Sequence, residues 1–135
     1  MPPEGRTPGS PSDWLRRARG DLTLAKVPLP RGGFYEDLCF HAQQAAEKAI
    51  KAIYRARMHE FRYTHDISEL LGGLEVRGIS VPEAVREAVD LTDFAWQTRY
   101  PGPAEPVSED QYHRAIALAE LVVKWAGELV EKGPG

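Results

Sequence analysis

The chain has 135 residues, of which 42% are hydrophobic and 27% charged, so we expect one globular domain and exclude disorder, collagen-like repeats and low complexity. No stretch reaches the roughly 20 apolar residues of a membrane-spanning helix, and the N-terminus lacks the apolar core of a signal peptide, so a cytoplasmic protein without membrane contact is expected. The single cysteine excludes a disulfide framework. The absence of asparagine fits a thermophilic source, although biased codon usage would leave the same composition.

Charge is unevenly distributed along the chain. Residues 1–65 carry 11 Lys and Arg against 7 Asp and Glu, a balance of +4, whereas residues 66–135 carry 6 against 13, a balance of −7. The two balances sum to the net charge of −3. Such a split marks either a basic binding face or two oppositely charged halves that pack together.

Helix-start signals divide the chain into five segments after a Pro- and Gly-rich tail over residues 1–9, which is predicted to be flexible. At each start a capping residue precedes an acid or a glutamine by three positions, and the pairs are Ser10/Asp13, Gly33/Glu36, Asp66/Glu69, Ser80/Glu83 and Ser108/Gln111. Apolar residues at helical spacing then predict helices over about 11–27, 34–58, 67–75, 82–99 and 109–131. The prediction is a single all-α domain over residues 10–132, an antiparallel bundle of four long helices plus one short helix.

Two of these helices have unusual features. The short third helix contains Gly72 and Gly73, which weaken it. The fifth helix carries a second apolar row, Leu118, Leu121 and Trp125, beside its core-facing stripe. A bundle helix needs only one apolar face. The second row therefore indicates either a central helix that contacts two neighbours or a surface for a homodimer or another partner.

Three motifs of this sequence resemble those of HEPN domains. They are the run from Phe34 to Ala52, the segment from Thr64 to Leu71, and Thr98-Arg99-Tyr100-Pro101. They occur in the expected order, and the resemblance covers roughly residues 12–130. It implies a small helical bundle, usually dimeric, from prokaryotic systems. Such domains are often encoded beside a minimal nucleotidyltransferase, in toxin–antitoxin-like pairs, and are associated with nucleotide or RNA handling.

The sequence departs from the ribonuclease members of the wider HEPN group. In those members an Arg is followed after four to six residues by the His that acts in phosphodiester cleavage. After Arg99 the corresponding positions hold Ala104, Glu105 and Pro106, and the next histidine is His113. The resemblance therefore implies a non-catalytic domain that binds nucleotide or RNA. The alternatives are a HEPN ribonuclease toxin with a non-standard active site and a plain protein-interaction module.

A polar stripe on the second helix is the first candidate for ligand contact. Its residues are spaced by four, three and four positions: Gln44, Lys48, Lys51 and Arg55. Lysine and arginine in such a row can follow the phosphates of a nucleic acid. The alternative is a solvated face, which the Glu47–Lys51 pair at i, i+4 favours.

The end of the predicted fourth helix is the second candidate. Arg99 falls on the core-facing side of that helix, where a guanidinium needs a carboxylate, a carbonyl or a ligand anion. It is expected either to bind a ligand or to pair with an acid such as Glu47 or Asp66. Tyr100 offers a ring for stacking on a base. The predicted nucleotide- or RNA-binding residues are Lys48, Lys51, His65, Arg99 and Tyr100.

Other chemistries find little support in the sequence. His65-Asp66 resembles the metal-binding pair of helical HD phosphohydrolases, but Asp66 is expected to cap a helix instead. No repeated Glu-x-x-His motif or phosphate-binding Gly-rich loop occurs. Cys39 falls on an apolar arc and is expected to be inert core. We therefore expect no catalytic residue, no metal and no cofactor.

Overall fold

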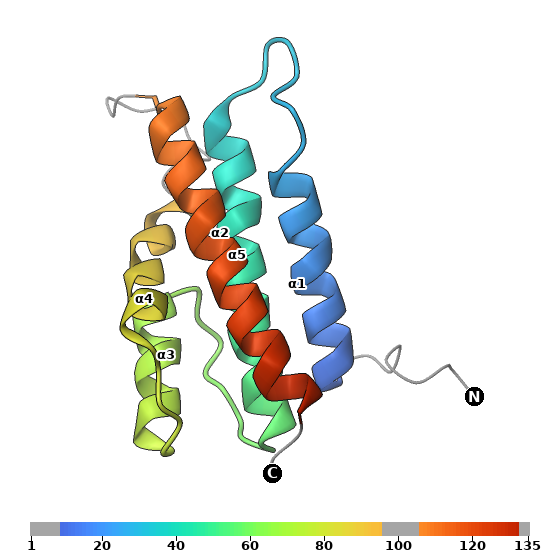
Figure 1. The fold of residues 1–135 in the computed structure, drawn as a ribbon, viewed down its shortest axis with the longest axis vertical. Coiled ribbons are helices and arrows are strands. Elements are labelled where there is room, and N and C mark those ends of the chain that lie inside the picture. The colour runs from blue at the N-terminus through green and yellow to red at the C-terminus, as the bar shows by residue number, and fades with distance from the viewer. Residues whose placement is uncertain (1–8, 96–105, 133–135) are drawn as a thin grey trace, which may run out of the picture.

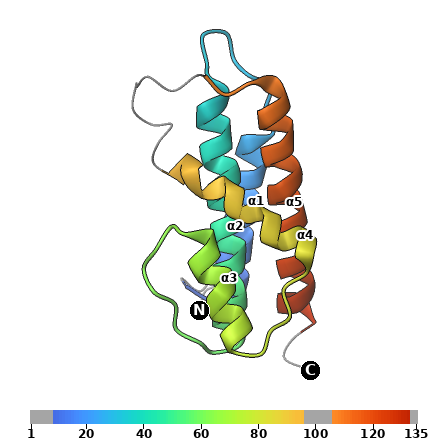
Figure 2. The ribbon, with the colours of Figure 1, turned by 90° about the vertical axis from the view of Figure 1, so that its left-hand side faces the viewer.

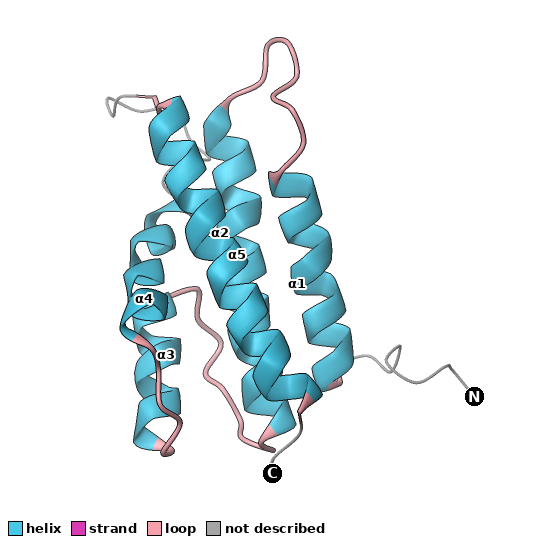
Figure 3. Ribbon diagram, in the orientation of Figure 1, coloured by secondary structure: helices cyan, strands magenta, loops and turns pink. Residues whose placement is uncertain are grey.

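The computed structural model describes residues 9–95 and 106–132, and this part of the chain contains helices and no strands (Figures 1 and 3). Its elements are α1 (Pro11–Ala25), α2 (Tyr35–Ala56), α3 (Ile67–Val76), α4 (Glu83–Arg86), the 3₁₀ helix η1 (Glu87–Ala95) and α5 (Glu109–Glu131). The all-α prediction is confirmed. None of the described helices is long and apolar enough to cross a bilayer.

Helix α2 is the centre of the bundle and contacts α1, α3, η1 and α5. Its inner face is rich in fully buried alanines, which let the neighbouring helices approach closely: Ala42, Ala45, Ala46, Ala49 and Ala52. Helix α1 runs opposite to α2, whereas α2 and α5 run in the same direction (Figure 1). The stacked rings of Tyr35 and Tyr112, with centroids 4.8 Å apart, place the starts of α2 and α5 at the same end. The segment between these two helices returns the chain to that end and forms a second layer of α3, α4 and η1 (Figure 2).

Three of the five predicted helix caps are confirmed. The Ser10 hydroxyl accepts from the Asp13 amide at 3.1 Å, the Asp66 carboxylate accepts from the Ser68 amide at 2.9 Å, and Ser108 forms a reciprocal capping box with Gln111. The other two were wrong, because α2 begins after Phe34 and α4 after Pro82, and neither residue has a side chain that can accept a backbone hydrogen bond. Helix boundaries shift only slightly as a result.

The predicted fourth helix takes a different form from the one expected. Only Glu83–Arg86 is α-helical, and Glu87–Ala95 continues as a 3₁₀ helix, while the predicted last turn lies outside the described residues. A 3₁₀ helix has three residues per turn, so every third side chain lies on the same row. Every third residue from Glu87 is an exposed acid, and every third residue from Ala88 turns toward the core. The acidic row therefore has the period of a 3₁₀ helix, whereas the buried residues Ala88, Leu91 and Ala95 are spaced by three and four positions, as an α-helix also allows.

The second apolar row of α5 is partly covered within the chain. Leu118 is buried and Trp125 is half-buried, since α4 and η1 both pack against α5. Leu121 remains exposed. Packing against α4 and η1 therefore accounts for part of the second apolar row. Leu121 is the residue of this row that stays exposed for contact with a partner. The expected homodimer stays a prediction.

Candidate functional site

Glu47 is buried on α2 and accepts hydrogen bonds from three side chains. Its carboxylate accepts hydrogen bonds from Lys51 Nζ at 2.7 Å, His65 Nδ1 at 2.8 Å and Gln43 Nε2 at 3.0 Å. Burial by itself raises the pKa of the Glu47 carboxyl, but the hydrogen bonds from Lys51, Gln43 and His65 outweigh it and hold the pKa below its usual value. Glu47 is therefore ionised at neutral pH and fixes the orientation of the His65 ring, whose side chain is 47% exposed.

Lys51 lies inside the bundle rather than on an exposed stripe. Its ammonium group is close to the ring centroids of Phe61 at 5.2 Å, Tyr63 at 5.5 Å and Trp14 at 5.7 Å. Rings at such distances attract a cation through their π faces. Together with Glu47 they enclose the charge, so Lys51 serves to hold the loop after α2 against α1 and α2. The alternative interpretation of the polar stripe, a face exposed to solvent, does not apply to Lys51 either, because its side chain is buried.

Lys48 belongs to a second cluster, between α1 and α2. Asp21 of α1 accepts from Lys48 Nζ at 2.6 Å and lies 3.1 Å from His41 Nδ1. Lys48 and His41 are both partly exposed, whereas Asp21 is nearly covered. The predicted stripe therefore has an uneven surface, in which Gln44 and Lys48 are half-buried and Arg55 is exposed. The structure places Lys48 and His65 beside the same two turns of α2, each with a carboxylate partner.

The remaining predicted residues take different positions. Arg99 and Tyr100 lie outside the described residues. Asp66 caps α3 while His65 turns to Glu47, so the two do not act as a pair. No group of three His, Cys, Asp or Glu side chains suited to a metal ion occurs within the described ranges. Cys39 is fully buried, and burial, helped by the nearby Glu36 carboxylate, raises the pKa of its thiol to about 12, as an inert core residue requires.

Several members of these clusters could not be identified from the sequence. Asp21 and His41 are 20 residues apart and meet only because α1 and α2 pack together. Trp14 and Phe61 likewise come from α1 and a loop, with ring centroids 5.6 Å apart. Gln43 is the exception, because a glutamine among the core-facing alanines of α2 is a polar residue that needs a buried partner.

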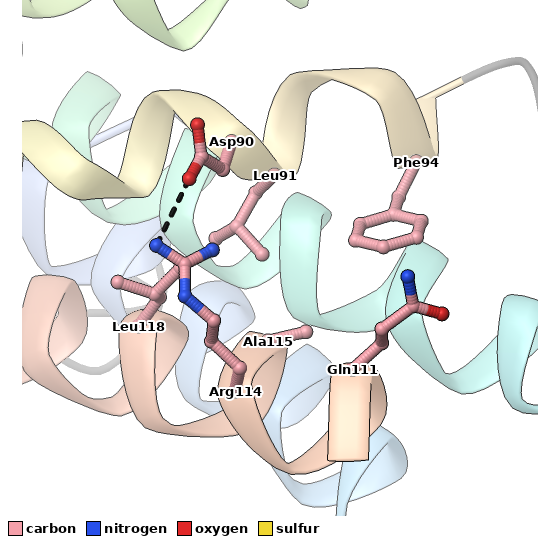
Figure 4. A pocket seen from close by; sticks show the side chains of 7 residues that line it. All are labelled: Asp90, Leu91, Phe94, Gln111, Arg114, Ala115 and Leu118. Carbon is pink, nitrogen blue, oxygen red and sulfur yellow. Dashed lines mark ion pairs between the residues drawn. The ribbon is translucent and has the colours of Figure 1, made fainter. Parts of the chain in front are cut away.

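A small groove between η1 and α5 does not coincide with these clusters (Figure 4). Its volume is about 180 Å³, below the usual range for ligand pockets. An ion pair of 2.9 Å between Arg114 and Asp90 lies along one side, and the lining residues are Asp90, Leu91, Phe94, Gln111, Arg114, Ala115 and Leu118. Lys48, Lys51 and His65, the predicted binding residues that the structure describes, do not line it.

The described residues thus form a small all-α domain in which one alanine-rich helix is central and carries two carboxylate-centred polar clusters. A family model for the HEPN domain matches residues 11–129, and the chain belongs to the HEPN domain family. The resemblance noted from the sequence is confirmed at this level. Its minimal-nucleotidyltransferase-associated subtype stays a prediction.

Two solved structures are similar to this chain. TT1696 from Thermus thermophilus is 34% identical, with a TM-score of 0.75, and the match covers 89% of this chain and 98% of that one. ST0689, described as an archaeal HEPN homologue, is 26% identical, with a TM-score of 0.71 and coverage of 90% and 98%. Both share the fold over nearly their whole length. No curated protein matches the chain significantly.

Proposed function

We propose that this HEPN domain binds a nucleotide or RNA without cleaving it and works with a minimal nucleotidyltransferase in a toxin–antitoxin-like system. The observation that carries the binding part is the half-exposed His65, which Glu47 orients through Nδ1. Lys48, partly exposed on the same helix turns, supplies positive charge. Arg99 and Tyr100 complete the proposed set on the strength of the sequence motif, with the arginine gripping an oxyanion and the tyrosine stacking on a base.

The absence of cleavage is proposed from the chemistry of the sequence. RNA hydrolysis usually requires a positioned general base and general acid, and no histidine follows Arg99 at the spacing of the HEPN ribonucleases. One observation favours the alternative of a ribonuclease with a non-standard site. His41 and His65 both approach a carboxylate through Nδ1, the arrangement that orients a catalytic histidine. The binding experiment therefore includes an assay for cleavage.

Titration calorimetry with AMP and with a short oligouridylate tests the proposal. We expect weak, salt-sensitive binding, no cleavage above background on gels, and a loss of about tenfold or more in affinity for His65→Ala, the effect of one charged hydrogen bond. His113→Ala is the matched control, because His113 is exposed on α5, where it lies 3.4 Å from Glu109 and its ring centroid is 5.4 Å from that of Tyr112. Intact binding by His65→Ala would remove His65 from the site, and RNA cleavage that depends on both His41 and His65 would establish the ribonuclease.

Assembly is the second part of the proposal. We expect a homodimer that uses α5, because Leu121 is 37% exposed beside the covered Leu118. Leu121→Arg should convert the dimer to a monomer in light scattering at micromolar concentration. Val76→Arg, at an exposed apolar position on α3, should leave the mass unchanged. A monomeric wild-type protein would contradict the dimer.

The proposed partnership with a minimal nucleotidyltransferase has its own test. Such a protein, encoded beside this chain and co-purified with it, would support the partnership.

A further inference from the structure

Three arginines at the end of the bundle differ from the other basic residues around α2. Arg55 lies in the last turn of α2, and Arg57 and Arg77 are the C-caps of α2 and α3. The two helices end on the same side of the molecule (Figures 1 and 2). Lys48 and Lys51 are neutralised by carboxylates, but within the described ranges the three arginines make no ion pair.

The side chains of this end form a continuous row. The Arg55 guanidinium lies 4.8 Å from the ring centroid of Phe61, whose ring is 5.9 Å from that of Tyr54. Arg77 lies 5.6 Å from the other ring, that of Tyr54. Nε of Arg57 is buried, and no hydrogen-bond partner for it is found among the described residues. The rings of Phe61 and Tyr54 hold two guanidinium groups in place, and Nη1 of Arg77 also donates a hydrogen bond of 3.0 Å to the carbonyl oxygen of Gly73. No described carboxylate forms an ion pair with either group.

Two large side chains of the segment that follows α2 are almost fully exposed. Tyr63 is 91% exposed and Met58 is 92% exposed. Met58 has a φ of 57°, a left-handed conformation that is uncommon outside glycine and that ends α2 abruptly. Basic residues at helix ends are favourable for the helix dipole, which explains the arginines. The contact of the Tyr63 ring with Lys51 Nζ, at 5.5 Å, leaves most of that ring exposed. We call Arg55, Arg57, Met58, Tyr63 and Arg77 the arginine pole.

We infer that the arginine pole docks a single-stranded polynucleotide. The phosphates of the bound strand contact Arg55, Arg57 and Arg77, and one of its bases stacks on the ring of Tyr63. Basic side chains that follow a backbone, combined with an exposed aromatic ring, are the usual elements of single-strand binding. The inference rests on the proposed function and extends it, because Tyr63 is two residues from His65.

Fluorescence anisotropy with a labelled oligouridylate of about 12 nucleotides tests the inference over a series of salt concentrations. Each phosphate contact of a single strand contributes about −0.7 to the slope of log K against log salt. Replacing all three arginines by glutamine, which keeps side chains on the rings, should reduce the magnitude of the slope by about 2. Tyr63→Ala should weaken binding about tenfold and leave the slope unchanged.

The loop between α1 and α2 provides a matched control at the opposite end of the bundle. Arg31 and Phe34 are exposed there, and the variant that combines Arg31→Gln with Phe34→Ala should bind the oligouridylate like wild type. Thermal melts of all variants show whether each is folded.

The outcomes separate the two proposals. If wild type binds neither AMP nor the oligouridylate, the proposed function fails. If wild type binds the oligouridylate and the pole variants keep its affinity and salt slope, only the arginine pole is overturned. Equally tight binding of a double-stranded oligomer that Tyr63→Ala does not affect would also overturn it. Loss of a protein partner from pole variants that still bind the oligouridylate normally would assign the pole to that partner instead.

Discussion

Replacing Glu47 by glutamine is expected to lower the free energy of unfolding by about 3–5 kcal/mol, the usual cost of removing one member of a buried ion pair. The side chains of Lys51 and Glu47 are only 5% and 4% exposed, so water cannot replace the carboxylate. The rings around Lys51 offset part of the loss, since each cation–π contact is worth about 0.5–2 kcal/mol. Chemical denaturation of the two proteins measures the difference.

Two further variants identify the cause of the effect. Adding Lys51→Met to Glu47→Gln should restore most of the stability, because an apolar side chain of similar size no longer leaves a charge buried. Glu120→Gln is the control for an exposed pair: Glu120 bonds Lys26 at 3.0 Å with both side chains about half exposed, and its loss should cost less than about 1 kcal/mol. Equal losses for the Glu47 and Glu120 variants would show that burial does not matter at this site.

The same carboxylate gives stability a dependence on pH. The hydrogen bonds from Lys51, Gln43 and His65 hold the pKa of Glu47 below its ordinary value of 4.5 in the folded protein, despite the opposing effect of burial. A pKa that is lower in the folded state adds stability that is complete above the unfolded value and is lost as the pH falls through the folded value. Wild type should therefore lose more of its melting temperature between about pH 5 and pH 3 than the Glu47→Gln, Lys51→Met variant does.

Local signals in the sequence were sufficient for most of the fold. Caps at Ser10, Asp66 and Ser108 fix three helix starts, because each is a bond between residues two or three positions apart. The 3₁₀ helix was missed because α-helical and 3₁₀ periods overlap over a short segment. Both periods place Ala88 and Leu91 near the core, and only the exposed acid at every third position separates them.

The candidate site was less accessible to sequence reasoning, for a physical reason. Helical spacing correctly places Lys48 and Lys51 on one side of α2 and pairs Glu47 with Lys51. It does not say what covers that side. The covering groups come from α1 and from the loop after α2, so the contacts of Lys48 with Asp21 and of Lys51 with Phe61 depend on packing between distant segments. Because of this packing, Lys48 remains partly accessible, whereas Lys51 becomes part of the core.

The two adjacent glycines of α3 are expected to respond in opposite ways to alanine. Alanine normally favours a helix over glycine by about 1 kcal/mol, and a Cβ at Gly72 would meet nothing within 4 Å. Gly72→Ala should therefore stabilise the protein by about that amount. A Cβ at Gly73 would overlap the hydroxyl oxygen of Tyr54. Gly73→Ala should instead destabilise by about 1–3 kcal/mol, the usual effect of overpacking a core.

The hydroxyl of Tyr54 makes the overlap at Gly73 costly. It is buried and donates a hydrogen bond of 2.6 Å to the carbonyl oxygen of Leu70, so it cannot move away without losing that bond. Tyr54→Phe alone should cost about 1 kcal/mol, the net value of one buried hydrogen bond. In the Gly73→Ala background the same change should raise stability, because it removes the overlapping atom. Chemical denaturation of the four proteins in this cycle measures the coupling, and additive effects would show that the hydroxyl does not set the requirement for glycine.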